Sequence, residues 1–124
     1  MGSNFQSAQG SRERDEMKVA LPRVIKEYID ASNAHDVKDV VSCFSDDALV
    51  QDEGKDFRGK KTIEDWVVKT IEKYKFRFKP LGVKSDDAEI VVSVEVSGTF
   101  PGSPVSPDYH FTIEGGKIRS LAIE

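Results

Sequence analysis

Four side chains in this sequence are of types that could do chemistry together: Tyr28, Asp52, Trp66 and Tyr109. Tyr28 and Trp66 fall on the apolar stripes of expected helices, Tyr109 falls on the inward face of an expected strand, and Asp52 ends another strand. Helices that pack over a curved sheet can leave an apolar cavity. A few polar groups that converge on such a cavity are typical of a small-molecule binding site.

Asp52 is the candidate general base of this group. A carboxylate in an apolar cavity is desolvated, which raises its pKa into the range that suits proton abstraction. Three interpretations stay open at this point. In the first, the tyrosines are core aromatics and Asp52 caps a loop. In the second, these residues line a pocket without chemistry, and in the third they are catalytic.

Other motifs of catalytic type are incomplete. The segment 54–61 has the spacing of a phosphate-binding loop, but Lys61 stands where that motif needs a hydroxyl. His35 and His110 are far apart, and the acidic pairs lack the spacing of a calcium loop, so we expect no metal and no cofactor. We place His35 in an exposed loop and His110 on the outer face of a sheet.

Two further features have ordinary structural explanations. Cys43 lies beside an apolar helical stripe and is expected to be a buried structural thiol. Lys75, Arg77 and Lys79 alternate along one strand face, which is typical of a solvated face or a dimer rim. An anion-binding surface is the alternative for this basic row.

The elements that must position these side chains follow from hydrophobic periodicity. A helical period predicts helices at residues 21–33, 37–44 and 60–73, with Asp36 as the N-cap of the second. A two-residue period and short apolar runs predict strands at 48–50, 74–79, 89–98, 108–114 and 118–123. Turns are expected at 85–87 and 115–116, and a loop between Gly54 and Gly59. Helices first and hairpin-linked strands later predict an α+β fold with an antiparallel sheet covered by helices on one face.

Composition limits the class of protein. A chain of 124 residues suits one domain, which we place at residues 17–124. Residues 1–16 have few apolar side chains and are expected to be disordered or left over from protein production. A net charge of −4 argues against nucleic-acid binding, and no apolar run approaches the roughly 18 residues that cross a membrane. One cysteine and no signal peptide predict a cytoplasmic protein.

Three segments resemble the nuclear-transport-factor-2-like superfamily, namely YIDASNAHD at 28–36, FSDDALVQD at 44–52 and FRGKKTI at 57–63. Within it the chain is most similar to the SnoaL-like group, which includes polyketide cyclases and ketosteroid isomerases. The segments GTFPGSP at 98–104 and GKI at 116–118 resemble an uncharacterised bacterial branch of that group. The resemblance covers residues 17 to 124 and implies a cone in which a strongly bent antiparallel sheet wraps three helices, often as a homodimer through the sheet.

The resemblance also implies roles for individual residues. Tyr28 falls where ketosteroid isomerases have the tyrosine of their oxyanion hole, and Asp52 falls, without a gap, where they have the carboxylate that moves the proton. Tyr109 stands where those enzymes have a protonated aspartic acid as the second oxyanion donor. A tyrosine hydroxyl could still donate a hydrogen bond to the oxyanion, so the resemblance implies an oxyanion site with a different second donor.

Two functions are therefore expected from the sequence. In the first, Asp52 abstracts a proton next to a carbonyl of a small apolar substrate, while Tyr28 and Tyr109 hydrogen-bond the developing enolate. The side chains expected to form the apolar pocket wall are Trp66, Phe44, Phe111 and Val24. In the second, the protein is a non-catalytic module that binds a ligand or dimerises.

Overall fold

The structure is a computed structural model that describes residues 20–85 and 89–124. The tail expected at residues 1–16, the domain start at residue 17 and most of the turn expected at 85–87 lie outside these ranges.

The helices of the described residues bury the apolar stripes that predicted them. They are α2 (Arg23–Asn33), α3 (Val37–Ser42) and α4 (Lys60–Tyr74). In α2 the buried stripe contains Val24, Ile25 and Tyr28. The side chain of Asp36 caps α3 by accepting a hydrogen bond from the backbone N–H of Asp39 at 3.1 Å, as predicted.

The second helix is shorter than predicted. It ends at Ser42, and Cys43 closes it through a backbone hydrogen bond to Val40 of 3.1 Å, which tightens the last turn. Phe44 therefore does not belong to this helix but begins a strand. The apolar side chain of Phe44 fits both the helical period and the two-residue period of a strand. The sequence pattern therefore did not show whether Phe44 ends the apolar stripe of the helix or begins a buried strand.

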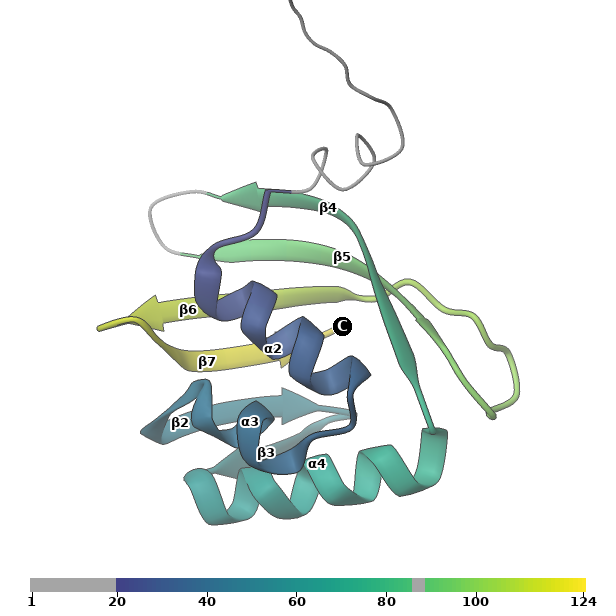
Figure 1. The fold of residues 1–124 in the computed structure, drawn as a ribbon, viewed down its shortest axis with the longest axis horizontal. Helices are drawn as coiled ribbons and strands as arrows, with labels where there is room; N and C mark the ends of the chain where they lie inside the picture. Colours follow the sequence, from purple (N-terminus) through teal and green to yellow (C-terminus); the bar gives the residue numbers. More distant parts are fainter. Residues whose placement is uncertain (1–19, 86–88) are drawn as a thin grey trace, which may run out of the picture.

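The strands of the described residues form one curved sheet in the order β3-β2-β7-β6-β5-β4. They are β2 (Phe44–Asp52), β3 (Lys55–Arg58), β4 (Arg77–Ser85), β5 (Ile90–Ser97), β6 (Asp108–Glu114) and β7 (Lys117–Ile123). Register shifts between Pro80 and Gly82, and between Thr112 and Ile113, interrupt the ladders. Such irregularities bend strands, and Figure 1 shows the sheet curling around α2.

Two features of the sheet correct the sequence-based prediction. The segment between Gly54 and Gly59, expected as a loop, contains β3, which pairs with β2 across a tight turn. In addition, β2 and β7 run parallel, so the sheet is mixed rather than purely antiparallel. Antiparallel directions were predicted from hairpins between strands that follow one another in the sequence. No hairpin links β2 to β7, because β3, α4 and three other strands lie between them along the chain.

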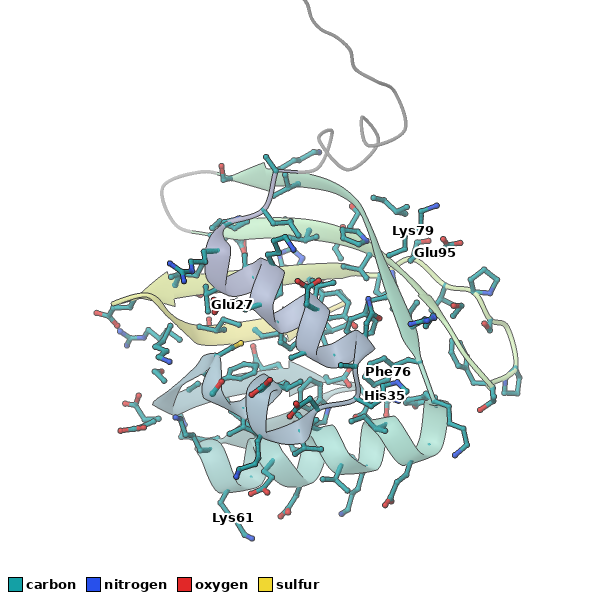
Figure 2. The ribbon with its side chains drawn as sticks, in the orientation of Figure 1. Glu27, His35, Lys61, Phe76, Lys79 and Glu95 are labelled. Atoms are coloured by element: carbon teal, nitrogen blue, oxygen red, sulfur yellow. The ribbon has the colours of Figure 1, made fainter. Side chains whose placement is uncertain are left out.

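The basic row predicted on one strand is also shorter. Helix α4 continues to Tyr74, and Lys75 adopts a left-handed conformation with φ of 46° as its C-cap. Arg77 and Lys79 remain on β4, where they are exposed, and Lys79 pairs in register with Glu95 of β5 (Figure 2). This acidic neighbour favours a solvated face with mixed charge over an anion-binding surface.

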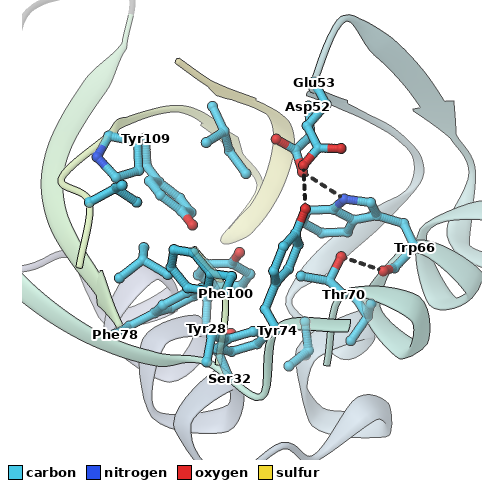
Figure 3. A pocket seen from close by; sticks show the side chains of 17 residues that line it. Tyr28, Ser32, Asp52, Glu53, Trp66, Thr70, Tyr74, Phe78, Phe100 and Tyr109 are labelled. Carbon is cyan, nitrogen blue, oxygen red and sulfur yellow. Dashed lines mark hydrogen bonds between the residues drawn. The ribbon is translucent and has the colours of Figure 1, made fainter. Parts of the chain in front are cut away.

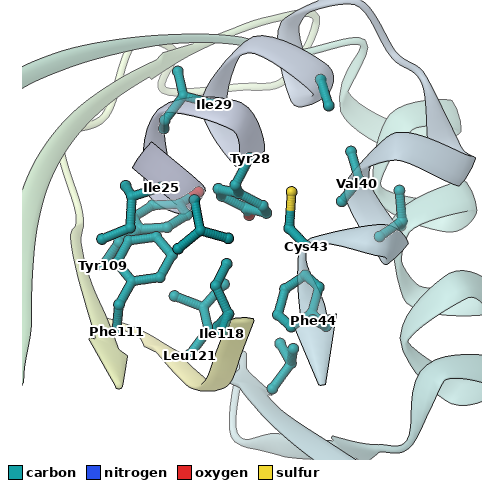
Figure 4. Close-up of a cluster of buried hydrophobic side chains, with 14 of the residues drawn as sticks. Ile25, Tyr28, Ile29, Val40, Cys43, Phe44, Tyr109, Phe111, Ile118 and Leu121 are labelled. Carbon is teal, nitrogen blue, oxygen red and sulfur yellow. The ribbon is translucent and has the colours of Figure 1, made fainter. Parts of the chain in front are cut away.

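The core lies between the concave face of the sheet and the helices. Helix α2 contacts β4 and β7, whereas α4 contacts β2 and β3 (Figure 1). At its centre the ring of Tyr28 lies 5.9 Å from that of Phe44 and 5.6 Å from that of Phe111, both edge-on (Figure 4). No helix within the described residues is long and apolar enough to span a bilayer.

The end of β5 approaches α4 closely at Gly98. A Cβ added there would lie 2.3 Å from the carbonyl oxygen of Tyr74, which also accepts the backbone N–H of Thr99 at 2.9 Å. We expect Gly98→Ala to lower the free energy of unfolding by about 1–3 kcal/mol, because overpacking forces the backbone to shift. Urea denaturation measures this loss.

Gly82→Ala is the matched control, because a Cβ at Gly82 would meet no heavy atom within 4 Å. It should change the free energy of unfolding by no more than about 0.5 kcal/mol. Equal losses at the two glycines would contradict the role assigned to the contact between Gly98 and Tyr74.

Candidate functional site

A cavity of about 240 Å³ opens between α2, α4, the concave face of the sheet and the segment after β5 (Figure 3). Much of its wall is aromatic, formed by Tyr28, Trp66, Tyr74, Phe76, Phe78, Phe100 and Tyr109. The charged residues among its described lining are Asp52 and Glu53. Drug-sized ligands usually occupy about 300–1,000 Å³, so this volume suits a somewhat smaller molecule.

Asp52 ends β2 and brings a half-buried carboxylate to this cavity. Its Oδ2 accepts a hydrogen bond of 3.1 Å from the indole N–H of Trp66 (Figure 3). Burial raises the pKa of Asp52 above its usual range, and the hydrogen bond from Trp66 offsets part of that rise. The carboxylate is thus made more basic by desolvation while one oxygen is held in place.

Tyr28 and Tyr109 bring two buried hydroxyls to the same cavity, with side chains only 2% and 4% exposed. Burial raises the pKa of both tyrosines, and the charge of Asp52 raises both further. Both hydroxyls are therefore neutral near pH 7 and can donate hydrogen bonds. A side-chain hydrogen bond with Ser32, one turn along α2, lowers the pKa of Tyr28 slightly.

The hydroxyl of Tyr109 differs from that of Tyr28 in its partners. Among the described residues, none forms a hydrogen bond with it, and it points into the cavity in Figure 3. The group is consequently available to a bound molecule.

The predicted pocket-wall residues are divided between the cavity and the core. Trp66 lines the cavity. Phe44, Phe111 and Val24 do not, and the structure places them in the buried core behind Tyr28, as Figure 4 shows for the two phenylalanines. All three are buried as predicted. The ring of Tyr28 packs edge-on against both phenylalanines, and Val24 lies on the same helix as Tyr28. Hydrophobic periodicity predicts which residues face inward, but it does not separate the packed core from the cavity wall.

Sequence reasoning missed the residues at the mouth of the cavity. The hydroxyl of Tyr74 donates a hydrogen bond of 2.6 Å to Glu53 Oε2, and its ring lies edge-on to Phe100 at 5.4 Å. Glu53 has a φ of 54° in the turn after β2, which directs the chain toward β3. The available signal was Glu53 next to Asp52 in the sequence, but chemistry was assigned to Asp52 alone.

The remaining candidates have structural roles. Segment 54–61 forms β3 and the start of α4. Burial raises the pKa of Cys43 to about 11, so its thiol is protonated at neutral pH. His35 is exposed, with Nε2 2.8 Å from the carbonyl oxygen of Phe76 (Figure 2), and His110 lies on the outer sheet face near Glu89. Among the described residues, no group of metal-ligating side chains gathers.

Comparisons with known proteins agree with this architecture. Residues 25–121 match the model of the SnoaL-like domain family. A proposed polyketide cyclase from Sinorhizobium meliloti has a structure with a TM-score of 0.81 and 36% identity, over 84% of this chain and 95% of that one. A comparison with curated proteins finds no match.

Two more distant structures share the fold and contain ligands. A protein from Catenulispora acidiphila with a ketosteroid isomerase-like fold, in complex with trimethylamine, has a TM-score of 0.75 and 14% identity, covering 85% of this chain and 86% of that one. A Mycobacterium tuberculosis protein in complex with estradiol-17beta-hemisuccinate has a TM-score of 0.69 and 15% identity, covering 82% and 89%.

The expected α+β cone is confirmed by the curled six-stranded sheet with three helices in the described residues and by further similar structures. These include a nuclear-transport-factor-2-like protein from Cytophaga hutchinsonii and a cystatin-fold protein from Novosphingobium aromaticivorans. Because the family match extends over most of the chain and the Sinorhizobium meliloti relative aligns over nearly its full length, this chain belongs to the SnoaL-like domain family.

Proposed function

We propose that this protein binds a small, mostly apolar carbonyl compound and moves a proton at the carbon next to the carbonyl group. The observation that supports this proposal is the arrangement of Asp52, Tyr28 and Tyr109 around one cavity. One desolvated carboxylate and two neutral hydroxyls are the groups that such a reaction requires.

The proton transfer can be written with these residues alone. The carboxylate of Asp52 takes the proton, and the electron pair of the broken C–H bond moves onto the carbonyl oxygen to form an enolate. Tyr28 and Tyr109 donate hydrogen bonds to that oxygen as its negative charge develops. Asp52 then returns the proton to the same or another carbon, so the protein ends unchanged.

Tyr109 is the main departure from the ketosteroid isomerase pattern. A protonated carboxylic acid is a stronger hydrogen-bond donor than a phenol, so the enolate would be stabilised less here. Desolvation partly compensates, because hydrogen bonds and charges act more strongly in a cavity from which water is excluded. Similarity to a proposed polyketide cyclase supports chemistry at a carbonyl-containing substrate without identifying it.

The proposed function is tested by hydrogen–deuterium exchange on a panel of small cyclic ketones, followed by NMR. For at least one ketone the exchange rate should exceed that in buffer and increase with pH as Asp52 ionises. Because burial raises the pKa of Asp52, the midpoint should lie above that of a solvated aspartate. Absence of catalysed exchange across the panel, or a rate without pH dependence, would contradict the proposal.

A second candidate function is ligand binding without catalysis. Two features favour it: Trp66 already occupies one oxygen of Asp52, and Tyr109 stands in place of the acid found in ketosteroid isomerases. Fold relatives in complex with trimethylamine and with estradiol-17beta-hemisuccinate show that similar scaffolds hold small molecules. Saturable binding of a ketone without exchange would favour this function.

We also propose a homodimer that pairs through the outer face of the sheet, in the cytoplasm. Ser93, His110 and Thr112 lie on that face and are only partly exposed. None of these three positions carries a long charged side chain, so a second sheet could pack there without burying one. The buried, protonated thiol of Cys43 is compatible with a reducing compartment.

A further inference from the structure

The charged side chains that line the cavity itself are of one sign. Asp52 and Glu53 are acidic, and among the described residues that line the cavity none is basic. Lys73 lies beside the mouth, with Nζ 5.1 Å from the ring centre of Tyr74, but it lines a neighbouring cleft and not the cavity itself. Lys55 and Lys69 line the same cleft, which shares Asp52 and Glu53 with the cavity. Within the wall of the cavity itself, a bound molecule meets the two carboxylates and no lysine or arginine of the described residues.

Most hydrogen-bond donors near these carboxylates are already in use. The indole N–H of Trp66 is bound to Asp52, the hydroxyl of Tyr74 to Glu53, and the hydroxyl of Thr70 to the carbonyl of Trp66 at 2.7 Å (Figure 3). The carboxylates keep lone pairs that these donors do not fill. The hydroxyl of Tyr109 is a free neutral donor, but the charged groups of the wall are carboxylates, which favour a cation over an anion as the bound charge.

Aromatic rings supply the rest of the wall. Phe78 is stacked on Phe76 at 4.5 Å and lies 5.6 Å from Tyr109, while Trp66 and Phe100 reach the cavity from α4 and from the segment after β5. The face of an aromatic ring carries negative electrostatic potential and attracts ammonium groups, most strongly where water is excluded. Rings and carboxylates therefore favour the same kind of ligand.

We propose that the cavity binds a small apolar molecule that carries a tertiary or quaternary ammonium group, held among the aromatic rings with Asp52 as its counter-charge. This binding goes beyond the proposed proton transfer and does not require it. The two are compatible, because a cation beside Asp52 favours the ionised carboxylate that a base needs, while it offsets part of the rise in pKa that burial causes.

The test uses three probes of nearly equal shape: choline, neohexyl alcohol, in which carbon replaces the nitrogen, and tert-butylacetic acid, which is ionised at neutral pH. Trp66 is the one tryptophan of the sequence, so its fluorescence reports on the cavity directly. Choline should bind at least about tenfold more tightly than the alcohol, and the acid should bind more weakly than both. Competition measured by NMR confirms that the probes share one site.

Asp52→Asn removes the negative charge of the site and keeps the shape of the side chain. This variant should lose most of the preference for choline over the alcohol while still binding the alcohol. Asp65→Asn is the matched control, since Asp65 is exposed on α4 and does not line the cavity. It should keep the wild-type preference within about twofold, because exposed charges contribute little.

The comparison of probes on the wild-type protein needs no substitution, so it decides the question even if Asp52→Asn does not fold. Equal or weaker binding of choline relative to the alcohol, preferential binding of the acid, or no saturable binding of choline would each overturn the proposal. None of these results depends on proton exchange, so failure of this proposal and failure of the proposed catalysis are distinguishable.

Discussion

Replacing Asp52 with asparagine should lower the rate of catalysed proton exchange by about 10²–10⁴-fold, the contribution typical of a positioned general base. Asparagine has the shape of aspartate, and its side-chain oxygen can still accept the hydrogen bond from Trp66. Its amide cannot take up a proton at neutral pH. The substitution thus removes the chemistry and leaves the wall of the cavity almost unchanged.

The measurement is the exchange rate of whichever ketone the wild-type protein turns over, compared between Asp52→Asn and the surface control Asp65→Asn. Circular dichroism establishes that both variants fold. The control should retain the wild-type rate within about twofold, because Asp65 is exposed and does not line the cavity. Equal rates in Asp52→Asn and wild type would remove Asp52 from the mechanism.

The same substitution should make the folded protein more stable at neutral pH. Folding raises the pKa of Asp52, chiefly by burial, so the ionised carboxylate is less favourable in the folded state than in the unfolded state. Its stabilising contribution is complete below the pKa of the unfolded chain and is lost as pH rises through the higher pKa of the folded state. Asparagine does not ionise and avoids this loss.

Urea denaturation at two pH values checks the sign. The stability advantage of Asp52→Asn should be largest at neutral pH and should disappear in acid, where the carboxylate of the wild-type protein is protonated. A variant that is less stable than wild type at neutral pH would indicate that hydrogen bonding, and not desolvation, dominates at Asp52. Lower activity together with higher stability is the pattern expected where a site keeps a costly group for function.

Periodicity predicted the parts of the fold that local sequence determines. The apolar stripe with Tyr28 predicted the end of α2 at residue 33 but its start two residues early, at 21, because Pro22 is the N-cap. Alternation around Tyr109 predicted β6 with the tyrosine facing inward. Tyr28, Tyr109 and Asp52 at the end of β2 all line one cavity in the structure, one of the interpretations that the sequence left open. Their role in catalysis is not contained in that geometry and stays a prediction.

Features that depend on distant parts of the chain were not predicted. The parallel pairing of β2 with β7 joins segments separated by most of the domain. The four residues of β3 have no apolar alternation, and pairing with β2 makes them a strand. The rings of Tyr74 and Phe100 meet where the backbone of Thr99 is hydrogen-bonded to the end of α4. Local sequence patterns do not predict this contact between distant segments at the mouth of the cavity.

Phe111→Ala should lower the free energy of unfolding by about 3–5 kcal/mol, the cost of removing a fully buried phenylalanine from a packed core. Phe111 has no exposed surface, and its ring packs against those of Tyr28 at 5.6 Å and Tyr109 at 6.2 Å (Figure 4). The loss is a large fraction of the 5–15 kcal/mol that is typical of a small domain. Thermal and urea denaturation measure it.

Phe100→Ala removes the same atoms at a different place and is the matched control. Phe100 is only partly buried and lies at the mouth of the cavity, so its loss should cost about 1 kcal/mol or less of stability while weakening choline binding. Phe111→Leu should recover much of the stability lost in Phe111→Ala, because it refills most of the volume. A similar loss of stability in Phe100→Ala and Phe111→Ala would contradict the division between core and cavity wall. If the division holds, Phe111 affects ligand binding only by supporting the rings of Tyr28 and Tyr109, whereas Phe100 contacts the ligand itself.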